Sequence, residues 1–213
     1  MEMNPPTHVE TESILVPTLR TRTWDFRLAR AISHIGSPTS LAVIGILIVA
    51  LWLNTAAAWY WASFEIFVTI LIPVGYVIYL LKRRRITDFD IYHRHQRTGP
   101  YILMLTCCTV TLAAMWLGLA PAILILFAAV GLIQILLMFL INLRWKISGH
   151  AAAMASFTML LFVLMDRAAL PFVLAMPLMI WSRVRLRRHT LAQTIAGTLL
   201  GITLFLVAKN LFL

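Results

Sequence analysis

Charged residues are scarce in this chain of 213 residues: Asp, Glu, Lys and Arg together make up 12%, whereas 61% of the residues are hydrophobic. Such a composition excludes an ordinary soluble core and is typical of proteins that cross a membrane several times. Internal repeats, heptads and linkers long enough to separate two domains are also lacking. We therefore expect an all-α membrane protein with a single transmembrane domain.

Cysteines and acidic residues are few as well. The two cysteines, Cys107 and Cys108, are adjacent within an apolar run, which argues against a structural disulfide or a cysteine metal site. The chain has 8 acidic residues against 18 Lys and Arg, which gives a net charge of +10. Because the basic residues lie in short loops between apolar runs, we expect membrane lipids and a phosphorylated lipid as partners, and no nucleic acid.

The amino-terminal region divides into two parts. Residues 1–23 lack the basic start and the apolar run of a secretory signal, so we expect a disordered polar tail. Residues 24–36 place Trp24, Leu28 and Ile35 on one helical face, which is typical of an amphipathic helix lying in the head-group layer. The remaining residues, 37–213, are predicted to form the transmembrane domain.

Hydropathy divides that domain into a bundle of six to seven transmembrane helices, since a helix needs about 20 apolar residues to cross the hydrocarbon. The first and the sixth predicted spans are short, and the sixth contains two prolines. The predicted spans cover residues 39–55, 63–81, 100–119, 121–143, 149–165, 168–181 and 191–211.

The order of the spans predicts that three loops share one membrane face. Two spans precede residues 82–99, two more separate that loop from residues 146–150, and two more lead to residues 182–188. These loops and the amino terminus carry nearly all of the Lys and Arg. The positive-inside rule therefore predicts a multi-pass cell-membrane protein whose loops and amino terminus face the cytoplasm.

Polar residues inside the predicted spans are rare. Glu65 falls near a span end, where we expect it to be solvated, and this argues against a channel or transporter. Gln134 is expected to form a hydrogen bond with a neighbouring helix. Gly197 and Gly201 are four residues apart, which predicts a close helix contact inside the molecule rather than a dimer. The oligomeric state stays open.

The loop before the fifth span has the features of an anion site. Ser148 directly precedes an apolar run and is a suitable N-cap, so the backbone N–H groups that follow point outward at the positive end of the helix dipole. Gly149 leaves room for an anion to approach the backbone, His150 supplies an imidazole beside it, and Lys146 lies just before. A Ser-Gly-His turn by itself is also a common cap.

The loop before the last span has complementary features. Arg183 offers a planar fork that matches phosphate oxygens. His189 and Gln193 are four apart, so on a helix the amide oxygen can hold one ring N–H while the other ring nitrogen faces a ligand. An Arg-rich loop alone is also an ordinary topology signal. The two loops together, on one face, favour a shared phosphate site.

With the loop at residues 82–99 included, the sequence resembles the type 2 phosphatidic acid phosphatase superfamily of membrane lipid phosphatases. That family carries Lys-x6-Arg-Pro, then Pro-Ser-Gly-His, then Ser-Arg-x5-His-x3-Asp. Ser148-Gly149-His150 matches the second motif, with Ile147 in place of its Pro, a change that should matter little. Ser182-Arg183 followed by His189 and Gln193 keeps the spacing of the third. The resemblance covers roughly residues 32–206.

The resemblance implies metal-independent phosphoryl transfer through a phosphohistidine. It makes His189 the nucleophile and His150 the acid that protonates the leaving oxygen. It also implies that Arg97, Arg183, Ser148 and the amide of Gly149 hold the phosphate oxygens. No cofactor is implied.

Three further departures from the motifs raise additional expectations. Asp90 stands where the first motif has Lys and Thr98 where it has Pro, which leaves Arg94 or Lys146 as candidates for the missing cation. Gln193 replaces an Asp that would orient and stabilise a positively charged histidine. Asp88 or Asp90 is the candidate for supplying that carboxylate from the neighbouring loop.

Two alternatives to hydrolysis remain. Without the motif Asp and Lys, the fold can serve as a protein that binds or transfers phosphorylated lipid, or as a membrane scaffold. Metal-dependent chemistry is the other alternative, although the His-Arg-His spacing matches no standard ligand pattern, so we expect no metal. Its candidate ligands are Asp88, Asp90, His93, His95, His150 and His189.

Overall fold

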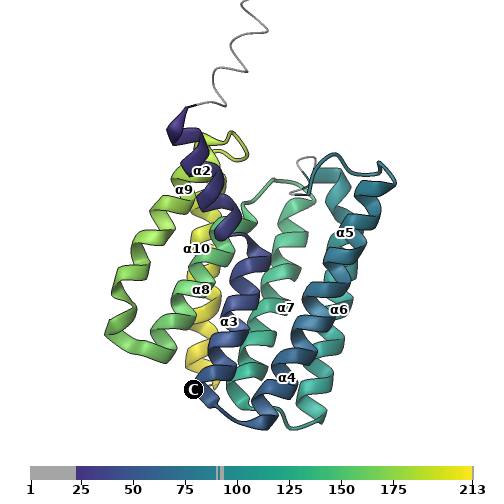
Figure 1. Ribbon diagram of the computed structural model, residues 1–213, viewed down its shortest axis with the longest axis vertical. Helices are drawn as coiled ribbons and strands as arrows, with labels where there is room; N and C mark the ends of the chain where they lie inside the picture. The colour runs from purple at the N-terminus through teal and green to yellow at the C-terminus, as the bar shows by residue number, and fades with distance from the viewer. Residues whose placement is uncertain (1–22, 90, 92–93, 213) are drawn as a thin grey trace, which may run out of the picture.

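The computed structural model of the protein describes residues 23–89, 91 and 94–212. Every regular element within these residues is helical (Figure 1). All but one residue of the predicted tail lie outside the described residues. The longer helices are α2 (Trp24–Ile35), α3 (Pro38–Leu53), α4 (Ala56–Ile66), α5 (Ile72–Lys82), α6 (Thr98–Leu117), α7 (Ala122–Asn142), α8 (Gly149–Met165), α9 (Ala175–Arg185) and α10 (Leu191–Phe212).

Three shorter elements complete the described chain. The π-helical turn η1 (Phe67–Leu71) joins α4 to α5, and the 3₁₀ helix η2 (Arg94–Arg97) leads into α6. The 3₁₀ segment η3 (Asp166–Leu174) connects α8 to α9. In Figure 1, α8 runs away from the end of the bundle where α2 lies, and α9 returns toward it. The two ends of the run Gly149–Arg185 therefore meet at the same end of the molecule.

The structure confirms a multi-pass membrane protein. Within the described residues, length and apolarity give five helical runs able to cross a membrane, or six when α2 and α3, bent by 48° at their junction, count as one span. The predicted sixth span, residues 168–181, differs most from the structure. Part of it is 3₁₀ helix, and the 11 residues of α9 extend only about 17 Å, roughly half of the hydrocarbon thickness.

The amphipathic segment at residues 24–36 is helix α2. Its apolar residues Trp24, Leu28 and Ile35 are exposed, whereas Ala29 and Ser33 form the face that is buried. That buried face packs on α9, where the hydroxyl of Ser182 donates a hydrogen bond to the carbonyl oxygen of Ala29 at 2.6 Å. The exposed apolar face remains consistent with a helix that lies against lipid.

Helices α8 and α10 form the most extensive helix pair of the bundle. A Cβ atom on Gly197 would lie 2.5 Å from the carbonyl oxygen of Ser148, and one on Gly201 would collide with the carbonyl oxygen of Ala152. Both glycines are therefore required by this contact, which confirms their predicted role in internal packing. Gln134 also behaves as predicted, since the hydroxyl of Ser156 on α8 donates to its amide oxygen at 2.5 Å.

The expected position of Glu65 was wrong. The hydroxyl of Thr55 caps α4 by accepting a hydrogen bond from the N–H of Ala58 at 3.2 Å, so the helix begins seven residues before the predicted start of the span. Glu65 thus lies well inside the helical run Ala56–Lys82, and only 4% of its surface is exposed.

Candidate phosphate site

The connections that carry the predicted site residues gather at one end of the bundle. In Figure 1, the α5–α6, α7–α8 and α9–α10 connections lie at the same end as α2. A backbone hydrogen bond ties two of them directly, because the N–H of Ser148 donates to the carbonyl oxygen of Gln193 at 3.2 Å. The structure therefore confirms that the predicted loops share one face of the bundle.

Ser148 is the N-cap of α8, as predicted. Its hydroxyl accepts a hydrogen bond from the N–H of Ala151 at 3.4 Å. Gly149 and His150 are the first two residues of the helix, so their N–H groups belong to the turn whose donors have no partner within the helix. The side chain of His150 is buried at this position.

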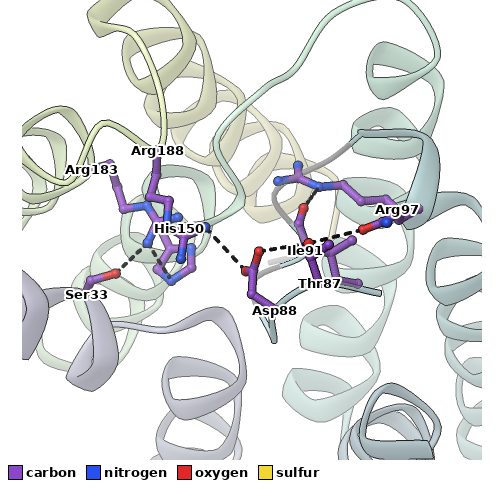
Figure 2. Close-up of polar contacts among 9 residues, drawn as sticks. Ser33, Thr87, Asp88, Ile91, Arg97, His150, Arg183 and Arg188 are labelled. Carbon is purple, nitrogen blue, oxygen red and sulfur yellow. Dashed lines mark hydrogen bonds and ion pairs between the residues drawn. The ribbon is translucent and has the colours of Figure 1, made fainter. Parts of the chain in front are cut away.

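Arg183 comes from α9, and its guanidinium contacts the imidazole of His150. Its Nη1 donates to the hydroxyl of Ser33 at 2.5 Å and lies 3.4 Å from Nε2 of His150; Figure 2 draws both contacts. Because a guanidinium N–H can only donate, Nε2 of His150 acts as the acceptor and carries no proton in this arrangement. Sequence reasoning missed Ser33, which is 150 residues away from Arg183 along the chain.

His189 lies in the turn between α9 and α10, and Gln193 determines its protonation. The amide oxygen of Gln193 accepts from the N–H of Thr190 at 3.2 Å, while the hydroxyl of Thr190 accepts from the N–H of Gln193 at 3.3 Å. This reciprocal pair is a capping box at the start of α10. The same oxygen lies 3.2 Å from Nδ1 of His189. Since an oxygen can only accept here, Nδ1 holds the ring proton and Nε2 keeps its lone pair.

The surroundings keep the imidazole of His189 neutral. Burial is the main cause that lowers its pKa to about 3, and the nearby charges of Arg183, Lys146 and Arg97 lower it further. Burial and the charges of Arg97, Arg188 and Arg183 also lower the pKa of Lys146 to about 8. These mutual effects indicate a concentrated positive potential around His189, which is suited to an anionic ligand.

The loop at residues 82–99 contributes Arg97 and Asp88. Nε of Arg97 donates to the carbonyl oxygen of Ile91 at 2.8 Å, and the carboxylate of Asp88 pairs with Arg188 at 3.3 Å (Figure 2). The predicted carboxylate beside His189 is thus engaged with the preceding residue, Arg188. Of the other predicted site residues, Asp90 and the side chain of Arg94 lie outside the described residues.

A cavity of about 650 Å³, which we call the outer cavity, joins these groups. It opens at the end of the bundle where the loops meet, and its wall includes both predicted histidines and two of the three predicted arginines of the site. Residues of the predicted site that line it are Arg97, Gly149, His150, Arg183 and His189. Segments from three parts of the chain therefore place two imidazoles and two guanidinium groups around one space large enough for a phosphate.

Among the side chains that the structure describes, no three of the His, Cys, Asp and Glu type come together as a metal site. The side chains of His93 and His95, which the metal hypothesis uses, are outside that set. Comparisons of the chain with protein-family models, with curated proteins and with solved structures each find no match.

Proposed function

We propose that the protein is a membrane phosphatase that removes phosphate from a lipid phosphate or an isoprenyl phosphate or diphosphate through a phosphohistidine. The observation that carries this proposal is the outer cavity, where His150, Arg183, His189 and Arg97 meet at one end of an apolar bundle. A lipid can leave its chain among the helices while its phosphate enters this basic space. The excess of Lys and Arg in the same loops supports a cytoplasm-facing site.

The tautomer of His189 suits a nucleophile. Its Nε2 keeps a lone pair because Gln193 holds the proton on Nδ1, and the low pKa keeps that lone pair available. A phosphate that replaces the contact between Arg183 and His150 allows Nε2 of His150 to take up a proton from solvent. In the proposed first step, Nε2 of His189 forms a bond to phosphorus, the bond from phosphorus to the lipid oxygen breaks, and protonated His150 gives that oxygen its proton. In the second step a water molecule loses a proton to His150 and attacks phosphorus, which releases inorganic phosphate and restores His189.

Arg183 holds the equatorial oxygens in this proposal. Its guanidinium contacts Ser33 and His150 in the described arrangement, and a phosphate between the two side chains would replace the contact with His150. The N–H groups of Gly149 and His150 at the start of α8 add neutral donors, and Lys146 adds positive charge. Placing charge and donors around these oxygens is most of what phosphoryl transfer requires.

The test is phosphate release from a panel of lipid phosphates, including a phosphatidate, an isoprenyl phosphate and an isoprenyl diphosphate. Wild type and His189→Ala are compared in the presence of a strong chelator. We expect release by wild type alone, together with an acid-labile, base-stable phosphate on His189 after rapid quenching. Full activity of His189→Ala would refute the mechanism, and loss of activity with the chelator would favour metal-dependent chemistry.

A second candidate is a protein that binds or transfers phosphorylated lipid without hydrolysis. The capping box favours it, because the one oxygen of Gln193 that holds His189 is uncharged and is shared with Thr190. Such an oxygen orients the ring but does not stabilise its positive form as a carboxylate does. Tight binding of the lipid phosphates without phosphate release by wild type would establish this candidate instead.

A further inference from the structure

A second cavity, which we call the inner cavity, lies deeper in the bundle. Its volume is about 180 Å³, and its walls come from α3, the α4–η1–α5 run, α6, α7 and α8, with one residue of α10. It adjoins the outer cavity, because several residues line both. These shared residues are Pro38, Thr39, Val74, Met104 and Ile135.

The inner cavity has a mostly apolar wall with two buried polar atoms that stand out. Glu65 is 4% exposed and Thr111 is fully buried. Neither Oε2 of Glu65 nor Oγ1 of Thr111 has a hydrogen-bond partner among the residues that the structure describes. Buried polar atoms normally have partners, and an ionisable residue within a membrane span marks a functional site. The cavity is therefore not adapted to hydrocarbon alone.

The two cavities follow one face of α6. Tyr101 lines the outer cavity, Met104 lines both, and Cys108 and Thr111 line the inner one. Because these positions recur every three or four residues, they form a continuous stripe along the helix. Ten residues separate Tyr101 from Thr111, which corresponds to about 15 Å, or half of the hydrocarbon thickness. Oγ1 of Thr111 thus lies about one leaflet below Tyr101.

We propose that the inner cavity binds one chain of an uncharged lipid alcohol and that Glu65 and Thr111 hold its hydroxyl group. A hydroxyl group both donates and accepts hydrogen bonds, so it can satisfy a carboxyl and a second hydroxyl together. The apolar wall accommodates the chain, and the volume is below the usual range for drug-sized ligands, which fits a single chain. Such an alcohol has two sources: the product of the proposed phosphatase, or an alcohol already in the membrane.

Photolabelling of the full-length protein in lipid nanodiscs tests this site. The probes are hexadecanol and hexadecane that carry a diazirine at the same carbon, and the labelled residues are located by mass spectrometry of peptides. We expect the alcohol to label the inner-cavity faces of α6 and α7 about tenfold more than the alkane, because only the alcohol satisfies the two polar atoms. Equal labelling by both probes, or alcohol labelling confined to lipid-facing residues, would overturn the proposal.

Two glycines provide a matched pair of variants. A Cβ atom on Gly131, which lines the inner cavity, meets no atom within 4 Å, and the same holds for Gly75, which is not among the residues that line the cavity. We expect Gly131→Leu to fill the space and reduce alcohol labelling at least tenfold, whereas Gly75→Leu leaves it unchanged. Equal effects of both variants would contradict a defined site. Thr111→Val, which keeps the shape of the side chain, should lower the preference for the alcohol without abolishing labelling.

A diazirine-bearing hexadecyl phosphate separates the two sources. Inner-cavity labelling that appears with wild type and disappears with His189→Gln identifies the product as the occupant. Labelling by added hexadecanol in both proteins, with none derived from the phosphate, identifies an alcohol of the membrane. Phosphate release without any labelling of the inner cavity would refute this inference and leave the proposed phosphatase intact. Labelling of the inner cavity by added hexadecanol without phosphate release would refute the phosphatase and leave this inference intact.

Discussion

The outer and inner cavities adjoin, yet they are built in opposite ways. The outer cavity takes its polar groups from helix ends and loops, and each of Arg97, Arg183 and His189 has a hydrogen-bond partner in the described structure. The inner cavity takes its polar groups from the middle of helices, where Glu65 and Thr111 each leave one atom without a partner among the described residues. The first arrangement holds a positive field in place for an anion. The second leaves room for a neutral group that supplies the missing hydrogen bonds.

The largest expected effect is that of His189→Gln, which should abolish phosphate release at the outer cavity without changing alcohol binding in the inner cavity. His189→Gln removes the proposed nucleophile, so phosphate release from the best substrate should fall by about 10⁴-fold or more. Because His189 does not line the inner cavity, labelling by the added alcohol probe should remain at the wild-type level. Measuring both on the same nanodisc preparation checks this, and a parallel loss of labelling would mean that the cavities do not act separately.

Arg183→Lys should have the next largest effect. The planar fork of arginine can contact a phosphate and Ser33 together, and lysine cannot reproduce that geometry. We expect kcat to fall by about 10² to 10³. The control is Arg185→Lys on the same helix, because Arg185 pairs with Asp25 at 2.6 Å rather than with the outer cavity. If the two variants lost activity equally, the loss would come from the packing of α2 on α9 instead.

Gln193→Asp should increase phosphate release and so enlarge the electrostatic difference between the outer and the inner cavity. A carboxylate at this position raises the pKa of His189 and stabilises the positively charged phosphohistidine. It can still accept from Thr190 and keep the start of α10. We expect release to rise about tenfold, measured by single-turnover kinetics. Gln193→Leu, which cannot hold the ring proton, should lower it, and a wild-type rate in both variants would show that Gln193 does not act on His189.

The smallest effect concerns alkaline pH. Lys146 has a pKa of about 8, so it is charged below pH 8 and loses its charge as the pH rises through that value. We expect kcat/KM for a lipid phosphate to fall about tenfold between pH 7 and pH 9, since kcat/KM reports groups of the free enzyme. Lys146→Arg should remove this alkaline fall while leaving the rate at pH 7 unchanged. An unaltered profile would assign the titration to another group.

Local patterns predicted the parts of the structure that depend on neighbouring residues. The cap at Ser148 follows from a hydroxyl just before an apolar run, and the contact of His189 with Gln193 follows from their spacing. Contacts between distant segments left no such signal. The partner of Arg183, Ser33, lies on a helix whose apolar residues pointed to lipid, and only the packing of α2 on α9 reveals its buried polar face.

The inner cavity escaped sequence reasoning for a related reason. Hydropathy predicted a span that begins at residue 63, which placed Glu65 near a span end, but the hydroxyl of Thr55 starts the helix earlier and carries Glu65 inward. The shortness of α9 was hinted at by Pro171 and Pro177, yet hydropathy alone does not distinguish a 3₁₀ segment from a regular crossing. Both errors concern where a helix begins: α4 begins at a single capping contact, whereas α9 follows the 3₁₀ segment η3 without a side-chain cap.

The amide oxygen of Gln193 is shared by the N–H of Thr190 and the ring of His189, so the orientation of His189 depends on the motion of the start of α10. Helix ends open and close on nanosecond to microsecond timescales. Each time the first turn of α10 frays, the acceptor that keeps the imidazole of His189 in one tautomer is withdrawn, and the ring is released to rotate. Any substitution that loosens this turn should therefore reduce the fraction of time during which Nε2 of His189 keeps its lone pair and its orientation, even when the substituted residue never touches a ligand.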